Sequence, residues 1–349
     1  MILFIGATPR KKRAMLGGGT VKNGTFIEYL SGKGVQVEVV DTADWRRRAL
    51  PILTSMFTKV IFKQPEVIIT SVFNDSASRL YKLFEIMKID RKAKLIHMPV
   101  GGNFASYIES NRELIGRFAK TSMIFAQSSK QVEQLRSLGL NQAEEIKNFR
   151  LLKTSILPEK LPYPEVPLKA VFFSRVTKEK GIEDAVKAVN KINDISTQSP
   201  LVYLDVFGPI DPPYREVFAG LIEGNRYCKY KGILTPCNEQ PQKTLSQYDF
   251  MVFPTFLDAE GFPGVIIDAL SSGLPVVASK WNFNSEFIED GKTGLLFEVK
   301  NVLDLQMKIN SLINNANELY SMKLECLREA RKYDAEVVLP NIVNRILNA

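Results

Sequence analysis

The sequence predicts an α/β protein made of two Rossmann-like domains, each a doubly wound parallel sheet. Short apolar segments of strand length alternate with helical segments along the whole chain, which is the pattern of parallel sheets covered by helices. The length of 349 residues suits two domains of ordinary size better than one. A segment with four prolines in ten residues, 158–167, separates the two halves, and proline there interrupts helix and sheet alike.

The predicted N-terminal domain is 1–157, the linker is 158–167, and the predicted C-terminal domain is 168–330. Residues 331–349 are predicted to form a C-terminal helix that can cross back to the N-terminal domain. Ligands of doubly wound sheets bind beyond the carboxyl ends of the strands. We therefore expect the ligand-binding edges of the two domains to face each other across a cleft.

Five strands are predicted in the N-terminal half because short apolar runs are bounded there by polar or turn-forming residues. They are residues 2–5, 35–40, 67–70, 94–97 and 123–126. Helices are predicted between them, among others at 24–30 and 76–87.

The C-terminal half repeats this alternation. Its predicted strands are residues 169–173, 201–207, 228–230, 250–253 and 275–278. A helix is predicted at 181–192, where apolar residues recur at the three- and four-residue spacing of one helix face.

The composition argues against several classes of protein. Hydrophobic residues make up 45% and charged residues 24%, and the apolar runs are far shorter than the roughly 20 residues of a membrane-spanning helix. The chain opens on the apolar run 2–5 without a basic leader, which we interpret as the first strand of a cytoplasmic protein. Three cysteines and a single histidine, His97, argue against a zinc site and against a histidine-activated nucleophile, so no metal is expected.

Positive charge is concentrated in the N-terminal half. Residues 1–150 contain 24 Lys and Arg against 13 Asp and Glu, a net charge of +11. Residues 151–349 contain 22 against 25, a net charge of −3. The basic half is therefore expected to meet an anionic partner: a membrane surface, a phosphorylated substrate or nucleic acid.

A predicted amphipathic helix belongs to this basic half. Its apolar stripe consists of Ile52, Leu53, Met56, Phe57, Val60 and Ile61. Trp45 and the arginines 46–48 precede the stripe, and the basic run 10–13 follows the first strand. This combination is typical of proteins that rest on anionic lipid headgroups. The alternative is that the stripe packs on its own sheet with the arginines in water. Nucleic acid is the poorer partner, because no recognition motif accompanies the charge.

The most specific segment is 253–278, which reads as a strand, a loop and a helix that begins near Pro263. Gly273 supplies the C-terminal stop of that helix before the next strand. Gly261 and Gly264 let a ligand approach the helix start, where free N–H groups favour phosphate.

Two carboxylates belong to the same segment. Asp268 lies four residues after Gly264, so it projects from the same helix face and can accept hydrogen bonds from the two hydroxyls of a ribose. Glu260, just before the helix, is placed to hold the hydroxyls of a sugar. A ligand with a ribose, phosphates and a sugar satisfies all of these elements; the alternative is that both carboxylates are solvated charges.

This segment resembles the signature of the retaining glycosyltransferases of family 4, whose GT-B architecture consists of two Rossmann-like domains. In that family a Glu, seven residues and a second Glu stand in a frame like Glu-Gly-Phe-Pro and Ala-x-x-x-Gly-x-Pro-Val-Val-Ala. Here the frame contains Glu260-Gly261-Phe262-Pro263, then Ala269, Gly273, Pro275, Val276, Val277 and Ala278. Asp268 replaces the second Glu and is one methylene shorter, which affects its reach to the ribose. The resemblance implies donor contacts by Glu260, Gly261, Phe262, Gly264 and Asp268.

Further matches extend over most of residues 165–300. Residues 173–181 resemble the family's element in which an arginine and a lysine bind the donor diphosphate, and the match falls on Arg175 and Lys180. Lys180 also precedes a helix, where a cation is disfavoured unless an anion binds nearby. The alternative is a pair of surface charges. The segment 286–296 resembles the stretch after the signature and is predicted to form structural turns, with Thr293 and Gly294 at the edge of the donor site.

The N-terminal half matches more loosely. Gly18 and Gly19 follow the first strand at a position where the family brings a glycine pair close to the donor, since glycine permits close backbone approach. His97 ends the fourth predicted strand, where related enzymes place a polar group near the reacting sugar. A lone histidine is also often structural.

The resemblance implies transfer of a sugar with retention of configuration, without a metal or cofactor. Glu260, Arg175, Lys180 and His97 are the expected catalytic residues. The expected donor is a UDP-sugar, and the expected acceptor is a lipid-linked oligosaccharide in capsule, exopolysaccharide or O-antigen synthesis, reached from an anionic membrane surface by the N-terminal domain. Two alternatives stay open: a transferase for a soluble or protein acceptor, and a non-catalytic nucleotide-sugar sensor.

Overall fold

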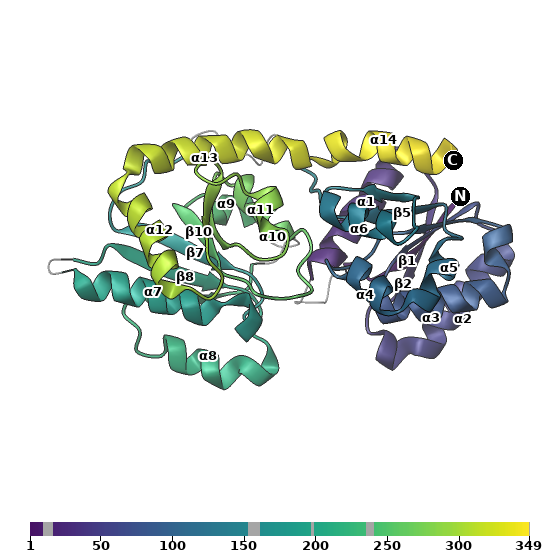
Figure 1. Ribbon diagram of the computed structural model, residues 1–349, viewed down its shortest axis with the longest axis horizontal. Coiled ribbons are helices and arrows are strands. Elements are labelled where there is room, and N and C mark those ends of the chain that lie inside the picture. Colours follow the sequence, from purple (N-terminus) through teal and green to yellow (C-terminus); the bar gives the residue numbers. More distant parts are fainter. Residues whose placement is uncertain (10–16, 153–160, 197–198, 235–240, 349) are drawn as a thin grey trace. The chain divides into compact units, whose positions relative to one another are not determined.

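The computed structural model describes residues 1–9, 17–152, 161–196, 199–234 and 241–348. The chain divides into two compact units: the first contains Met1–Leu151, Ala259–Phe262 and Ala335–Ala349, and the second contains Leu152–Asp258 and Pro263–Asp334. Each unit holds one six-stranded parallel sheet flanked by helices (Figure 1). The predicted fold class, two doubly wound Rossmann-like domains, is confirmed. The basic run 10–13, linker residues 158–160 and Cys237 lie outside the described residues.

The first sheet has the strand order β2-β1-β3-β4-β5-β6. Its strands are β1 Ile2–Gly6, β2 Val37–Asp41, β3 Val67–Ser71, β4 Lys94–His97, β5 Met123–Ala126 and β6 Ala143–Glu145. Ile2 lies opposite Val37 on one side and Val67 on the other, so the chain reverses its direction of travel across the sheet at β1. Ligands of doubly wound sheets bind at such a reversal.

Helices cover both faces of this sheet. They are α1 Gly18–Gly32, α2 Trp45–Lys63, α3 Asn74–Ile86, α4 Phe104–Ser110, α5 Ile115–Phe118, α6 Ser129–Ser137 and α14 Ala335–Asn348. On one face, residues of α2 to α6 such as Met56, Phe84 and Phe118 share an apolar core with the strands. On the other face, α1 and α14 pack over the strands through Phe26 and Leu339.

The second sheet has the strand order β12-β11-β10-β7-β8-β9. Its strands are β7 Leu168–Phe173, β8 Val202–Phe207, β9 Cys228–Gly232, β10 Phe250–Phe253, β11 Val276–Ser279 and β12 Gly294–Phe297. Its helices are α7 Ile182–Ile195, α8 Arg215–Ile222, α9 Pro241–Leu245, α10 Gly264–Leu270, α11 Asn284–Phe287, α12 Val302–Asn314 and α13 Ala316–Ala330. The chain reverses between β7 and β10, which pair with each other.

One apolar core joins α7, α8 and α12 to the strands of the second sheet (Figure 1). The four residues of β10 are completely buried, as expected for a central strand of a parallel sheet covered on both faces. Because the strands are parallel and β10 lies between β7 and β11, the carboxyl ends of these three strands lie side by side at one edge of the sheet.

All ten predicted strands are present, with ends shifted by up to two residues. The two short outer strands β6 and β12 were not predicted. The helix predicted at 24–30 begins six residues earlier, at Gly18. Helix α2 begins at Trp45, so Trp45 and the arginines 46–48 form its first turn before the apolar stripe, and the helix is kinked at Arg48.

The described part of the predicted linker packs on the second unit. Leu161 is buried against Gly273, and the Tyr163 hydroxyl donates a hydrogen bond to Asn317 Oδ1 at 2.8 Å. Among the described residues, no helix combines the length and the apolar character needed to cross a membrane.

Candidate functional site

The carboxyl end of β7 leads into a turn that carries Arg175. Gly208, just after the neighbouring β8, has φ +145°, and a side chain on it would lie 1.8 Å from the carbonyl oxygen of Ser174. Glycine at 208 therefore lets the backbone before Arg175 pass directly over the end of β8. The side chain of Arg175 is exposed, and it forms no ion pair with any residue that the structure describes.

The next turn carries Lys180 and is tied to the loop after β10. Gly181 has φ +73°, and a side chain on it would lie 2.1 Å from the carbonyl oxygen of Pro254. The N–H of Phe256 donates to the carbonyl of Glu179 at 2.8 Å. The Lys180 ammonium lies 5.2 Å from the centre of the Phe253 ring. Because β7 and β10 are neighbours in the sheet, these two loops meet at its carboxyl edge.

The loop after β10 is also held from the other side. Trp281 Nε1 donates to the carbonyl of Leu257 at 3.1 Å, and Asn282 Nδ2 donates to the carbonyls of Leu257 and Asp258 at 3.1 and 3.0 Å. The hydroxyl of Ser279 donates to the carbonyl of Thr255. Three successive strand ends, those of β7, β10 and β11, thus form one backbone-bonded scaffold beneath Arg175 and Lys180.

Asp268 lies on α10 of the second unit. The helix begins at Gly264 after Pro263, and no side chain caps its start. Asp268 follows Gly264 by one helical turn and is 8% exposed, while its carbonyl accepts hydrogen bonds from the hydroxyls of Ser271 and Ser272. The spacing of Gly264 and Asp268 on one helix face is as the sequence predicts.

Glu260 belongs to the segment Ala259–Phe262, which packs within the first unit. The N–H of Gly102 donates to the Ala259 carbonyl at 3.1 Å. Gln127 Oε1 accepts from the Phe262 N–H at 3.2 Å, and Asn148 Nδ2 donates to the Phe262 carbonyl at 2.9 Å. These hydrogen bonds fix the backbone on both sides of Glu260. Glu260 itself is 9% exposed.

Three residues that position Glu260 were missed by sequence reasoning: Gly102, Gln127 and Asn148. A side chain on Gly102 would lie 2.1 Å from the Glu260 carbonyl oxygen, so glycine is required for this close approach. A glycine pair at 101–102, shortly after the strand at 94–97, was a usable signal for Gly102. The amides give no such signal, because their partners lie more than a hundred residues away along the chain.

Gly18 and Gly19 lie in the first turn of α1. A side chain on Gly18 would meet no atom within 4 Å, whereas one on Gly19 would lie 3.0 Å from Val100 Cγ1. Residues 10–16, which precede them, lie outside the described residues. Among the described residues, space is therefore open beside Gly18, whereas Gly19 fits closely against Val100.

His97 ends β4 and is completely buried. Its Nδ1 lies 2.9 Å from Thr70 Oγ1, and its ring packs 4.9 to 5.5 Å from the rings of Tyr81, Phe104 and Phe118. Nε2 has no hydrogen-bond partner among the described residues. Burial lowers the pKa of His97 to about 3, so the ring is neutral. These surroundings suit a core histidine.

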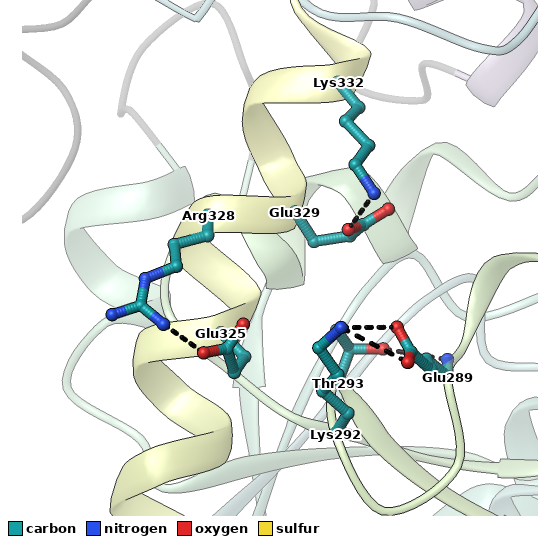
Figure 2. Close-up of polar contacts among 7 residues, drawn as sticks. All are labelled: Glu289, Lys292, Thr293, Glu325, Arg328, Glu329 and Lys332. Carbon is teal, nitrogen blue, oxygen red and sulfur yellow. Dashed lines mark hydrogen bonds and ion pairs between the residues drawn. The ribbon is translucent and has the colours of Figure 1, made fainter.

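The segment 286–294 forms part of a small acidic cavity of about 260 Å³ in the second unit, lined by Glu286, Glu289 and Glu329 among others. Figure 2 shows that Lys292 pairs with Glu289, and Lys332 with Glu329, at 3.0 and 2.7 Å. Thr293 is buried and accepts the N–H of Glu289 at 2.9 Å. These contacts are those of a structural turn.

Within the described ranges, no group of three or more His, Cys, Asp or Glu side chains is placed to hold a metal ion. Cys228 and Cys326 are free and buried.

The fold and these loops define a class: a two-unit, Rossmann-like α/β protein that presents Arg175 and Lys180 at the carboxyl edge of one sheet. Residues 154–332, just over half of the chain, match the family of glycosyl transferases group 1. The chain belongs to this family.

Two characterised relatives match parts of the chain. Sulfoquinovosyl transferase SQD2 of Arabidopsis thaliana is 25% identical over 189 residues, which is 53% of this chain and 34% of the relative. Poly(ribitol-phosphate) alpha-N-acetylglucosaminyltransferase of Staphylococcus aureus is 36% identical over 108 residues, which is 30% of this chain and 21% of the relative. The matched parts thus amount to about a third or less of these relatives' own lengths.

Among solved structures, HepE of Anabaena in complex with UDP aligns with a TM-score of 0.72 at 15% identity, covering 100% of both chains. At that identity the likeness shows the fold, which is GT-B.

Proposed function

We propose that the protein is a retaining glycosyltransferase of family 4 that moves a sugar from a nucleotide-sugar to a glycan acceptor. The observation that carries this proposal is the backbone-bonded scaffold at the ends of β7, β10 and β11. It sets Arg175 and Lys180 beside the loop that leads to Glu260 and Asp268. Membership in the group 1 family supports the same activity. The UDP bound by the Anabaena protein favours a UDP-sugar as donor.

In this reaction the bond between the anomeric carbon and the nearest diphosphate oxygen breaks, and the acceptor oxygen bonds to that carbon. The acceptor hydroxyl gives its proton to the departing diphosphate oxygen, and the diphosphate leaves as part of the nucleotide. Arg175 and Lys180 stabilise the negative charge that develops on the leaving diphosphate, and such fixed charges contribute most where they need no rearrangement. Two fixed cations at this position supply the charge that a metal ion supplies elsewhere, so we propose catalysis without metal or cofactor.

The other site residues receive roles from their positions. Asp268 accepts hydrogen bonds from the ribose hydroxyls, and Gly264 leaves space for the phosphates at the start of α10. Glu260 holds the sugar hydroxyls, with Gly261 and Phe262 beside it. Gly18 and Gly19 form the N-terminal contact with the donor. We assign His97 to the core of the first unit, since its ring is enclosed by aromatic side chains.

The proposed acceptor is a lipid-linked oligosaccharide used in capsule, exopolysaccharide or O-antigen assembly, with the first unit touching an anionic membrane on its cytoplasmic side. Support comes from α2: Met56 is buried, whereas Leu50 and Phe62 are 76% and 79% exposed, and Arg47, about one turn before Leu50, is exposed too. The other residues of the predicted stripe differ in burial. Ile52, Phe57 and Val60 pack on the core, whereas Leu53 and Ile61 are exposed. Exposed apolar and basic side chains on one helix favour an interfacial position.

The donor experiment is a panel of nucleotide-sugars incubated with the protein, with nucleotide release measured without acceptor. One donor should be hydrolysed slowly. Release should fall at least about a hundredfold in Glu260→Gln and in Arg175→Ala, the loss typical of removing a transition-state contact. Lys178→Ala, an exposed lysine of the same turn, is the matched control and should retain activity. Unchanged release in both site variants would remove the site assignment, and donor binding without release under any condition would favour the sensor alternative.

The membrane experiment is co-sedimentation with vesicles that contain phosphatidylglycerol. The wild-type chain should sediment, and the double variant Leu50→Ser, Phe62→Ser should stay in solution. Val217→Ser, an exposed apolar residue of α8, is the control. A wild-type chain that ignores vesicles while transferring sugar would favour the soluble or protein acceptor.

A further inference from the structure

A second cavity, of about 490 Å³, lies in the first unit. It is lined by Trp45, Arg46, Phe73, Asp75, Ser76 and Arg79. These residues come from the start of α2, which follows β2, and from the segment that follows β3. Because β1 lies between β2 and β3, the cavity lies at the carboxyl edge of the sheet where the chain reverses direction. This is the position at which doubly wound sheets bind ligands.

Two aromatic side chains are unusually open to solvent here. Trp45 is 43% exposed and Phe73 is 66% exposed, although both are large apolar groups. They come from segments 28 residues apart in the sequence and line one cavity. Exposed aromatic faces in a hollow favour a ligand with an apolar ring face, such as the C–H face of a sugar.

Two guanidinium groups share the cavity. The Arg79 guanidinium lies 5.9 Å from the centre of the Trp45 ring. Within the part of the chain that the structure describes, neither Arg46 nor Arg79 forms an ion pair. Arginine is the side chain best suited to bind phosphate or carboxylate with two parallel hydrogen bonds. The cavity therefore favours an anion.

The remaining lining groups suit hydroxyls. Ser76 can donate and accept, and the carboxylate of Asp75 can accept from a hydroxyl. Asp75 also lies close to the Tyr107 hydroxyl: burial first, and then the Asp75 carboxylate, raise the pKa of Tyr107. With two arginines and one aspartate the lining keeps a net positive charge.

We propose that this cavity binds a negatively charged sugar unit, one that carries a phosphate or a carboxylate, as part of the acceptor. The sugar ring stacks on Trp45 and Phe73, its acidic group pairs with Arg46 and Arg79, and its hydroxyls meet Asp75 and Ser76. This inference rests on the proposed function, because it names the chemical class of the acceptor for that reaction.

The test is a binding measurement that needs no catalysis. The chain has two tryptophans, so a Trp281→Phe background leaves Trp45 as the only indole that reports by fluorescence. Glucose 6-phosphate and glucuronate are the probes, with glucose, inorganic phosphate and phosphatidylglycerol vesicles as comparisons. Both acidic sugars should change the Trp45 emission at concentrations at which glucose and inorganic phosphate do not.

Variants that remove one arginine charge each then test whether Arg46 and Arg79 bind the acidic group of the sugar. In that background, Arg46→Gln and Arg79→Gln should each weaken binding of glucose 6-phosphate about tenfold, the loss expected for one charge-assisted hydrogen bond. Arg91→Gln, an exposed arginine outside the cavity, should leave the affinity unchanged, and thermal unfolding confirms that all variants are folded.

Four results would overturn the proposal: equal binding of glucose, equal binding of inorganic phosphate, a response to vesicles alone, or no difference between the Arg79 and Arg91 variants. Failure here and failure of the proposed function are distinguishable. Donor hydrolysis without any response to acidic sugars removes only the acceptor assignment. A response to acidic sugars without hydrolysis of any nucleotide-sugar leaves the cavity assignment and removes the transferase proposal.

Discussion

The carboxyl edges of the two sheets are built differently. In the second unit the turns after β7 and the loop after β10 are joined by backbone hydrogen bonds and by glycines that no other residue can replace without overlap. In the first unit the segments after β2 and β3 carry large exposed side chains, Trp45 and Phe73, around an open cavity. One edge is defined by its backbone and the other by its side chains.

This difference corresponds to the two kinds of ligand in the proposed reaction. A nucleotide diphosphate is the same for many enzymes, so we expect a fixed backbone with two cations to be enough to bind it. Acceptors differ between enzymes, and exposed side chains on a common sheet can change without disturbing the fold. Glu260 is a special case, because its loop follows β10 along the chain but packs within the first unit.

The largest effect is expected at Gly181. Alanine there is strained at φ +73° and overlaps the Pro254 carbonyl, so the Lys180 turn must move away from the loop after β10. We expect Gly181→Ala to lower the free energy of unfolding by about 3 kcal/mol and nucleotide release about a hundredfold. Urea unfolding and the donor assay measure both. Gly116→Ala is the control, because a side chain there meets no atom within 4 Å; an equally stable and active Gly181→Ala would contradict the idea of a backbone-defined edge.

The next effect concerns the loop of Glu260. In Gly102→Ala the new methyl group overlaps the Glu260 carbonyl oxygen, so Glu260 moves while Arg175 and Lys180 stay in place. We expect catalytic turnover to fall about a hundredfold with a loss of stability of only about 1–2 kcal/mol. Binding of UDP should change little, because its proposed contacts Arg175, Lys180 and Asp268 all belong to the second unit. Unaltered turnover would show that the position of Glu260 is unimportant.

The two units also differ in how each holds a buried lysine, Lys22 in the first unit and Lys323 in the second. Lys323 donates to the Tyr248 carbonyl at 2.6 Å and lies 3.9 Å from Asp249 Oδ1, whereas Lys22 lies over the Phe149 ring at 5.9 Å. Burial lowers the pKa of Lys323 to about 8 and that of Lys22 to about 7. We expect Lys323→Met to destabilise the protein by about 2 kcal/mol, because Asp249 loses its partner, and Lys22→Met to be neutral or stabilising by about 1 kcal/mol.

The pH dependence of the unfolding free energy tests the lowered pKa of Lys22. Because the folded pKa of Lys22 lies below its ordinary value of 10.5, the unfolded chain binds more protons above about pH 7. The stability contribution of Lys22 therefore rises with pH from about 7 toward 10.5, by up to about 1.4 kcal/mol per pH unit. Urea unfolding at pH 7 and 8 should show a smaller rise in Lys22→Met than in Lys130→Met, an exposed control. Equal slopes would contradict the lowered pKa.

The smallest effect is expected at the acidic cavity of the second unit. In the Lys292–Glu289 and Lys332–Glu329 pairs (Figure 2) the two partners are three residues apart in the sequence, and the lysine side chain is exposed. Lys292→Ala and Lys332→Ala should each change the unfolding free energy by less than about 0.5 kcal/mol and leave nucleotide release unchanged. Lost activity in either variant would mean that the segment 286–294 contributes to the site.

The sequence predicted what local patterns encode. Nine of the ten predicted strands are runs of four or more mainly apolar residues between turn residues, and only the strand predicted at 228–230 is shorter. β6 was missed because its three residues, Ala143–Glu145, form no apolar run, and β12 was missed because Gly291, Lys292 and Thr293 made its start look like part of a turn. The positions of Arg175 and Lys180 after β7 and of Asp268 on α10 could be predicted because these residues lie within short motifs, and their roles in binding a donor stay predictions. The contacts of Gly102, Gln127 and Asn148 with the Glu260 loop depend on tertiary packing that no local pattern specifies, as does the placement of Trp45 and Phe73 in one cavity.

The central claim is that Arg175 and Lys180 bind a nucleotide diphosphate at the edge of the second sheet. Calorimetric titration of UDP into the wild-type chain, Arg175→Ala, Lys180→Ala and Lys178→Ala tests it most directly. Wild type and Lys178→Ala should bind UDP with the same affinity, and the Arg175 and Lys180 variants should bind at least about tenfold more weakly, since each loses one charge-assisted contact to phosphate. Equal UDP affinity in all four proteins would contradict the account.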